Sequence, residues 1–309
     1  MIRIQEWIHK FEVGEGTHVV RLVLAILAFL ALTALYDIRE YKNFSTAEAM
    51  DTAQLARNLA AGDGFTTQCI RPLSIHLVEQ HQIALKQRTN DFSMLKSSHP
   101  DLANPPVYPL ILAGLMKVLP FQWEIPKVEV PGGTVFFRYQ PEILIAFFNQ
   151  ALLIAAILMV FRLARRLFDA TVAWISVFVL AGTDLFWRFS VSGLSTMLLL
   201  VIFLGLVWCL VSMEQAAREG RRGGGWFAGV AFLAGALVGI GALTRYSFGW
   251  LLLPVLAFFL LFFEKRRAMP CFAALLAFVA MFPARWRSRP SRKAFRKHLN
   301  FPATGWNGR

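Results

Sequence analysis

Residues 191–212 read VSGLSTMLLLVIFLGLVWCLVS, an apolar run of 22 residues that contains no Asp, Glu, Lys, Arg or His. As an α-helix, a run of this length would measure about 33 Å, which is close to the thickness of the hydrocarbon core of a bilayer. Five further apolar blocks flank this run, at 142–161, 170–187, 226–243, 246–263 and 268–282. The repeated blocks predict a six-helix transmembrane bundle over residues 142–282.

The overall composition supports a membrane protein. Hydrophobic residues make up 56% of the 309 residues, charged residues make up 17%, and the mean hydropathy is +0.51. Soluble domains contain about 45–50% apolar residues, and disordered chains contain fewer. The net charge of +13 does not indicate nucleic-acid binding, because most Lys and Arg residues lie in short loops between apolar blocks or in the C-terminal tail. The three cysteines, Cys69, Cys209 and Cys271, show neither a disulfide pattern nor metal-ligand spacing.

The loop charges predict the topology. Three loops carry three basic residues each, and these alternate with turns that carry a single arginine: the clusters are Arg162, Arg165 and Arg166; Arg218, Arg221 and Arg222; and Lys265, Arg266 and Arg267. Basic loops remain on the cytoplasmic side of a membrane. All three clusters lie inside if residues 1–18 form a cytoplasmic interfacial segment and residues 19–36 form the first transmembrane helix. The alternative for residues 19–36 is a cleaved signal peptide. Residues 37–141, which contain ten acidic and ten basic residues, then form a large outer loop.

The expected fold is therefore an all-α, polytopic protein of the inner or plasma membrane with about seven transmembrane helices. Within the outer loop, Val107–Leu119 is apolar but shorter than the roughly 17 residues needed to span a bilayer. We expect this segment to form a helix lying on the membrane surface.

Polar residues that could perform chemistry lie in the outer loop and at the outer ends of the helices. Ser45 and Glu48 have the spacing of a capping box, and Gly62 marks the end of the helix that they open. Glu48 and Asp51 share one face of that helix, where carboxylates can bind a sugar hydroxyl or act as a general base. The alternatives are a capping role for Glu48 and a solvated helix face for Asp51.

Two further features leave alternatives open. Asp101 stands just before Pro105-Pro106 and is a second candidate acid, with a simple polar loop as its alternative. Gly235, Gly239 and Gly241 could mark a broken helix of a transporter, but small residues more often allow close helix packing.

Four segments, in this order, carry a resemblance to a known family: ARNLAAGDGF at 56–65, NPPVYPL at 104–110, RLARRLFD at 162–169, and FSVSG at 189–193 followed by LTRY at 243–246. Together they resemble the membrane glycosyltransferases of the GT-C superfamily. This superfamily includes the protein O-mannosyltransferases, the aminoarabinose transferases of lipid A and related lipopolysaccharide sugar transferases.

The resemblance implies an inverting transfer of a hexose or pentose from a polyprenyl-phosphate donor to a lipid, glycan or protein acceptor at the outer face. It implies that Glu48 is the acid of the first outer loop, with Asp51, one turn further on, as a co-candidate, and that Asp101 is the second loop acid. It implies that Arg245 lies near the donor phosphate, with help from Arg188, although Asp184 stands four residues before Arg188 and could simply pair with it. No metal-ligand set is expected from the sequence, although the resemblance allows a divalent metal.

The chain departs from the family in two respects. No acid stands shortly after the Ser-x-Gly at the helix start, since residues 193–197 contain none, and fewer spanning helices are expected than in the family. Residues 283–309 contain eight Lys or Arg and no acid. The expected topology would put this segment on the outer side, which contradicts the rule that basic segments remain in the cytoplasm. We expect this tail to be out of frame, and the chain to be truncated; the alternative is a basic tail that binds anionic lipid headgroups. The other functional readings are an inactive fragment or non-catalytic member of the same fold, and a lipid or sugar transporter.

Overall fold

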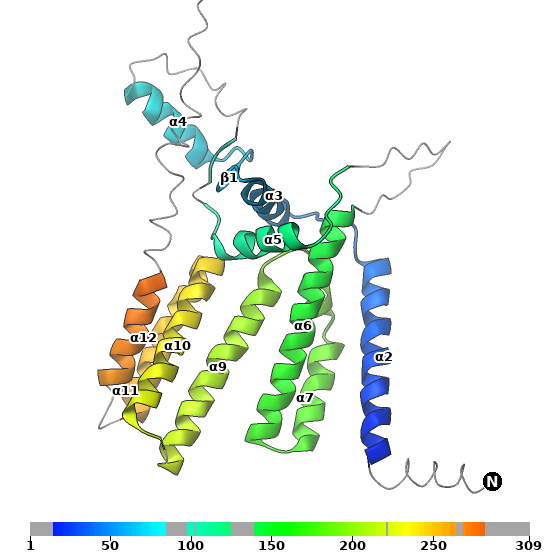
Figure 1. The fold of residues 1–309 in the computed structure, drawn as a ribbon, viewed down its shortest axis with the longest axis vertical. Coiled ribbons are helices and arrows are strands. Elements are labelled where there is room, and N and C mark those ends of the chain that lie inside the picture. Colours follow the sequence, from blue (N-terminus) through cyan, green and yellow to red (C-terminus); the bar gives the residue numbers. More distant parts are fainter. Residues whose placement is uncertain are drawn as a thin grey trace, which may run out of the picture.

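The computed structural model describes residues 15–84, 98–101, 103–124, 139–220, 222–263 and 268–281. Two expected segments, the interfacial residues before Glu15 and the basic tail 283–309, lie outside the described residues. Helices dominate (Figure 1): α2 Glu15–Arg39, α3 Ala47–Ala61, α4 Pro72–Ala84, α5 Val107–Val118, α6 Gln140–Leu167, α7 Ala170–Gly182, α8 Asp184–Val191, α9 Thr196–Glu219, α10 Gly224–Thr244, α11 Leu252–Phe262 and α12 Ala268–Met281. A short 3₁₀ helix η2 (Tyr246–Leu251) precedes α11, and strands β1 (Thr66–Thr67) and β2 (His99–Pro100) form a two-stranded sheet.

The expected all-α membrane class is confirmed. Within the described residues, α6, α9 and α10 are long and apolar enough to cross a bilayer, and α7 with α8 makes a fourth span if the pair, bent by 56°, is counted as one. The expected number of about seven spans is not shown by this criterion. The block 246–263 is divided between η2 and α11, and the block 268–282 forms a helix of only 14 residues.

Helices α10 and α12 pack closely through small residues. A Cβ atom on Gly235 would lie 2.1 Å from the carbonyl oxygen of Ala274, and one on Gly239 would lie 2.8 Å from Cγ of Met281. Ala234 and Ala274 are fully buried at this contact. The packing interpretation of these two glycines is therefore confirmed. At Gly235 only glycine lets the two backbones approach this closely, and at Gly239 a Cβ atom would meet the side chain of Met281.

The short helices lie across one end of the bundle (Figure 1), where α3 and α5 rest on the amino-terminal ends of α6 and α9. Helix α5 occupies the segment that the sequence predicts as a surface helix. Its Tyr108 is buried and donates a hydrogen bond of 3.1 Å from the hydroxyl to Oδ1 of Asn149 in α6. The end of the bundle is therefore joined to its cap by a polar contact as well as by apolar packing.

The start of α3 differs from the expected capping box. The N-cap residue is Thr46, whose Oγ1 accepts a hydrogen bond of 3.4 Å from the amide of Ala49. Because the helix begins one residue later than Ser45 would require, Glu48 does not occupy the third helical position of a capping box. The predicted end of the helix is correct, since Gly62 adopts a left-handed conformation with φ of 90°.

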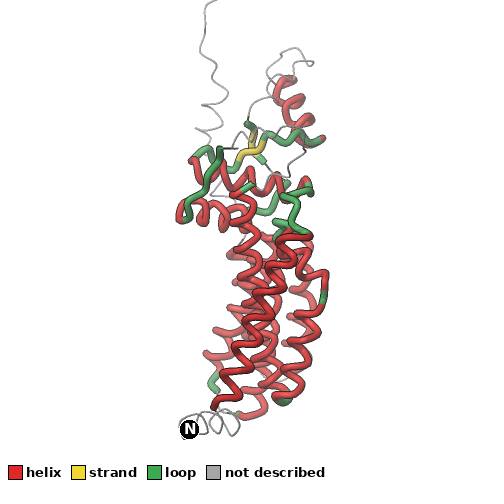
Figure 2. The backbone as a smooth tube through the Cα atoms, turned by 90° about the vertical axis from the view of Figure 1, so that its right-hand side faces the viewer, coloured by secondary structure: helices red, strands yellow, loops and turns green. Residues whose placement is uncertain are grey.

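Two of the basic loops lie at the opposite end of the molecule from α3 and α5. The turn between α6 and α7 and the turn between α9 and α10 both lie at the lower end in Figure 1. Arg166 joins these two regions, because Nε donates to Oε1 of Gln215 at 2.7 Å and Nη1 donates to Oγ of Ser212 at 3.0 Å. Figure 2 shows from the side that the long helices run in a common direction and that the small sheet lies near one end of them.

Candidate functional site

The small sheet brings two distant parts of the outer loop together. Strands β1 and β2 are antiparallel, with Thr66 opposite Pro100 and Thr67 opposite His99. The amide of Asp101 continues this pairing by donating to the carbonyl oxygen of Phe65 at 3.1 Å. As a result, the segment that follows α3 lies beside the segment that precedes α5.

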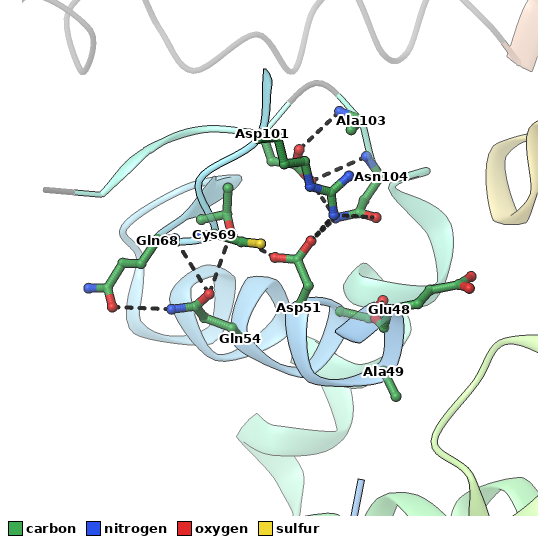
Figure 3. Close-up of polar contacts among 12 residues, drawn as sticks. Glu48, Ala49, Asp51, Gln54, Gln68, Cys69, Asp101, Ala103 and Asn104 are labelled. Atoms are coloured by element: carbon green, nitrogen blue, oxygen red, sulfur yellow. Dashed lines mark hydrogen bonds and ion pairs between the residues drawn. The ribbon is translucent and has the colours of Figure 1, made fainter. Parts of the chain in front are cut away.

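Asp51 is buried on the face of α3 that meets this sheet, with only 5% of its surface exposed. Its Oδ1 accepts a hydrogen bond of 2.7 Å from Oγ1 of Thr67, and its Oδ2 accepts one of 2.6 Å from Nδ2 of Asn104. Arg71 forms an ion pair with the same Oδ2. The carboxylate is thus held by three donors from three different segments, as Figure 3 shows for Asn104.

Asp101 is also buried, and its side chain folds back on the backbone that follows it. Its Oδ1 accepts from the amide of Ala103 at 2.9 Å, and its Oδ2 accepts from the amide of Asn104 at 3.2 Å. Nδ2 of Asn104 lies 2.6 Å from Oδ2 of Asp101 and 2.6 Å from Oδ2 of Asp51. The two acids that the sequence predicts separately are therefore joined by one amide (Figure 3).

Arg71 balances part of this buried negative charge. Burial acts to lower the pKa of its guanidinium, but the carboxylates of Asp51 and Asp101 and a hydrogen bond to Cys69 outweigh burial, and the pKa is raised above its ordinary value. The arginine is therefore charged at any physiological pH. Such a partner is needed here, because a buried carboxylate without a compensating charge or hydrogen bonds would be costly.

Glu48 is not part of this cluster. Its side chain is exposed and points away from Asp51, as Figure 3 shows. One helical turn separates the two acids, but the face that carries Asp51 is covered by the sheet while Glu48 faces outward.

Arg188 and Arg245 lie on helix ends at the same end of the bundle. Nε of Arg188 lies 2.6 Å from Oδ2 of Asp184, and its Nη1 lies 3.7 Å from Oε2 of Glu40 in the turn after α2. The pairing with Asp184 that the sequence left open is therefore present. Arg245 is exposed at the carboxyl end of α10, where its amide donates to the carbonyl oxygen of Gly241 at 2.8 Å. Neither arginine contacts Asp51 in the described part of the chain.

A pocket of about 380 Å³ opens between α3 and the amino end of α6. Asp51, Gln54 and Cys69 line one side, and Tyr139 and Glu142 line another. The other lining residues are mostly apolar or aromatic: Ala47, Met50, Ala53, Arg57, Met116, Trp123, Pro141 and Ile145. The size of this pocket and its few polar groups are typical of a small-molecule site.

Glu142 enters the pocket wall because α6 begins with Gln140-Pro141-Glu142. Its Oε2 accepts a hydrogen bond of 2.6 Å from the amide of Phe44, in the segment between α2 and α3. Phe44 in turn covers Gly193, where a Cβ atom would lie 2.4 Å from the ring and φ is +75°. Glycine at the end of the FSVSG segment is thus needed both for the turn and for the approach of Phe44.

Sequence reasoning missed Arg71, Asn104 and Thr67 as partners of Asp51. Asn104 stands at the start of the NPPVYPL segment, so its position next to Asp101 was visible in the sequence. No sequence signal pointed to Arg71, which precedes α4 by one residue.

The donor set does not fit a divalent metal as it stands. Within the described ranges, no group of three or more His, Cys, Asp and Glu side chains could hold a metal ion. Oδ2 of Asp51, which Asn104 links to Asp101, is already paired with the guanidinium of Arg71. This positive charge would repel a cation.

One comparison with known proteins gives a match. Residues 135–286, which are 152 of the 309 residues, match the family model described as dolichyl-phosphate-mannose-protein mannosyltransferase. The match begins just before α6 and continues past α12, so it does not include Asp51 or Asp101. The searches found no matching curated protein and no matching solved structure.

Proposed function

We propose the function of this chain from the premise that it is a membrane glycosyltransferase of the GT-C type, the class that its family match supports. The proposed reaction moves a hexosyl or pentosyl group from a polyprenyl-phosphate donor to a hydroxyl of a lipid, glycan or protein at the outer face of the inner or plasma membrane. The observation that carries this proposal is the buried carboxylate of Asp51, which lines a pocket at the end of the bundle that carries the short helices.

The proposed chemistry is a single displacement. The acceptor hydroxyl gives its proton to Asp51 as its oxygen bonds to the anomeric carbon of the sugar. The bond between that carbon and the carrier phosphate oxygen breaks, and the phosphate leaves with the electron pair. One displacement inverts the configuration at the anomeric carbon. Asn104 and Asp101 position Asp51 for this step, because Nδ2 of Asn104 fixes the orientation of both carboxylates.

The proposed topology places this site outside. The proposed topology has seven crossings, made by α2, α6, α7–α8, α9, α10, η2–α11 and α12. It would put the N-terminus and the basic turns together in the cytoplasm. Asp51 and the pocket would then face the outer leaflet, where the sugar of a lipid-linked donor is available.

Replacing Asp51 tests the assignment of the base. We expect Asp51→Asn to reduce the transfer rate by about 10²–10⁴-fold, the usual contribution of a general base, since asparagine keeps the size of the side chain but cannot accept the proton. Glu48→Gln is the matched comparison on the same helix, and we expect it to retain most of the activity because Glu48 points away from the pocket. The rate of sugar transfer from a radiolabelled polyprenyl-phosphate sugar measures both variants. A larger loss in Glu48→Gln than in Asp51→Asn would move the base to Glu48.

Arg245 remains our proposal for a contact with the donor phosphate. An exposed arginine at the outer end of α10 can hold two phosphate oxygens at once, and lysine cannot reproduce this bidentate geometry. We expect Arg245→Lys to raise the KM for the lipid donor by about tenfold, the effect of losing roughly 1.4 kcal/mol of binding, while the amount of inserted protein is unchanged. An unchanged KM would remove Arg245 from the site. Arg188 is a weaker candidate, because Asp184 and Glu40 already balance its charge.

Two alternatives predict different results. An inactive member of the same fold would show no transfer and no dependence on Asp51, and a lipid or sugar transporter would move its substrate without any need for this carboxylate. Among the described residues, the cluster of ionisable side chains at the end of the bundle rather than at its middle favours the transferase over the transporter.

A further inference from the structure

Asp51 cannot receive a substrate hydroxyl on the oxygen that it shares with Arg71. A carboxylate offers about four lone-pair positions, and Thr67, Asn104 and Arg71 already occupy three of them. Two of these three donors converge on Oδ2 alone. A general base in this position therefore has to lose a partner before it can accept a proton on that oxygen.

Arg71 is the partner that can leave most readily. Thr67 is 1% exposed and belongs to β1, and Asn104 is 7% exposed and is held by Asp101. The side chain of Arg71 is 29% exposed, against 4% for the side chain of Asp51. Its long side chain thus reaches from the solvent-facing rim of the cluster to the buried acid.

The donor offers Arg71 a competing anion. A sugar linked to a polyprenyl phosphate carries a negatively charged phosphodiester, and guanidinium groups bind phosphate oxygens through paired, charge-assisted hydrogen bonds. The same guanidinium cannot make its best contacts with Asp51 and with a phosphate at the same time. Donor binding and the ion pair with Asp51 are then competing events.

We propose that Arg71 exchanges Asp51 for the phosphate of the lipid donor, so that donor binding releases Oδ2 of Asp51 for the acceptor hydroxyl. This inference rests on the proposed function. The exchange breaks no covalent bond and transfers no proton; one ion pair replaces another. As a consequence, Oδ2 of Asp51 becomes available to the acceptor only when a donor occupies the site.

If Asp51 and the phosphate compete for Arg71, substitutions of Asp51 and of Arg71 change the affinity for a polyprenyl phosphate in opposite directions. Removing the charge of Asp51 frees Arg71, so Asp51→Asn binds a polyprenyl phosphate more tightly than the wild type, by about 5-fold or more, at the lower end of typical couplings between sites. Arg71→Gln binds it more weakly, by about tenfold, the equivalent of roughly 1.4 kcal/mol. In the double variant, Asp51→Asn brings no gain, because the arginine for which it competes is absent.

The experiment measures binding of farnesyl phosphate to the full chain in lipid nanodiscs. Farnesol and inorganic phosphate are the two comparison ligands, and they separate recognition of the lipid phosphate from recognition of the lipid tail or of free phosphate. The matched controls are Glu214→Gln and Arg218→Gln, which break an ion pair of 2.5 Å at the opposite end of the bundle. These controls leave the affinity unchanged. Arg71→Lys serves as the second variant at this position, since it keeps the charge in the cluster, and thermal unfolding checks each protein.

The outcomes distinguish this inference from the proposed function. If the wild type binds farnesyl phosphate and Asp51→Asn binds it equally or less tightly, there is no competition and the exchange is wrong, while the lipid-phosphate donor survives. If Arg71→Gln and Arg71→Lys both bind as tightly as the wild type, Arg71 does not contact the phosphate and the exchange is again wrong. If the wild type binds farnesyl phosphate no better than farnesol, the lipid-phosphate donor of the proposed function fails and the exchange fails with it.

Discussion

Asn104 shows how one side chain can keep two buried acids in place. Its side-chain nitrogen carries two N–H groups, and these serve Asp51 and Asp101, each at 2.6 Å. Without them the two carboxylates would each lose a donor inside the protein, where an unpaired acceptor costs about 1–3 kcal/mol and a charged one costs more. The amide therefore stabilises the outer loop as well as orienting the candidate base.

We expect Asn104→Leu to destabilise the protein more than a comparable substitution elsewhere in the same loop. Asn58→Leu is the control, because Nδ2 of Asn58 donates at 2.7 Å to the carbonyl oxygen of Thr66, which carries no net charge. Leucine removes the side-chain donor at both positions, so the difference reports the deeper burial of Asn104 together with the charge of its acceptors. Thermal unfolding in detergent, followed by intrinsic fluorescence, measures both variants. Equal or smaller loss for Asn104→Leu would show that the cluster does not depend on the bridge.

At the scale of elements, the contact between α10 and α12 depends on glycine at one face of α10. The Cβ atom of an alanine at Gly235 would meet a backbone oxygen of α12, which cannot move without separating the helices. On the same helix, Gly229 has no atom within 4 Å of the position that a Cβ would take. The two glycines thus share a helix but differ in their surroundings.

This difference predicts opposite effects of the same substitution. Gly235→Ala should lower the stability of the bundle by about 1–3 kcal/mol, the usual cost of overpacking, because the two backbones must separate. Gly229→Ala should leave the stability unchanged or raise it by up to about 1 kcal/mol, since alanine favours helix over glycine. Unfolding by denaturant in detergent micelles compares the two variants. A stabilising effect of Gly235→Ala would contradict the packing described for this interface.

At the scale of the whole molecule, the ends of the bundle have different chemistry. One end carries the short helices, the buried acids and the pocket, and the other carries the arginine-rich turns between the long helices (Figure 1). Because membrane proteins keep their basic loops in the cytoplasm, we propose that the two ends lie on opposite sides of the bilayer.

Cysteine labelling tests this orientation. In a variant whose native Cys69, Cys209 and Cys271 are replaced by serine or alanine, Lys117→Cys adds a thiol on α5 and Glu219→Cys adds one at the end of α9; both positions are exposed. We expect a membrane-impermeant maleimide to label Lys117→Cys in intact cells and to label Glu219→Cys only after the cells are permeabilised. The reverse pattern would place the pocket in the cytoplasm and would rule out a site on the outer face.

The sequence alone indicated the apolar helices and the helix now seen as α5, and it favoured a packing role for Gly235 and Gly239. These features depend on hydropathy and residue size within a short window, which neighbouring residues decide. The sequence also singled out Asp51 and Asp101, but only as separate candidates.

Only the tertiary structure decided what surrounds these acids. The donors to Asp51 stand 16, 20 and 53 residues further along the chain, and they meet because β1 pairs with β2 across a long connection. Thr46 rather than Ser45 caps α3, and Phe44, just before these residues, is held through its amide by the side chain of Glu142 in α6, 98 residues further along the chain. Hydropathy places a segment in the membrane, whereas a hydrogen bond needs two atoms in contact, and for these residues that contact exists only after the outer loop has folded over the end of the bundle.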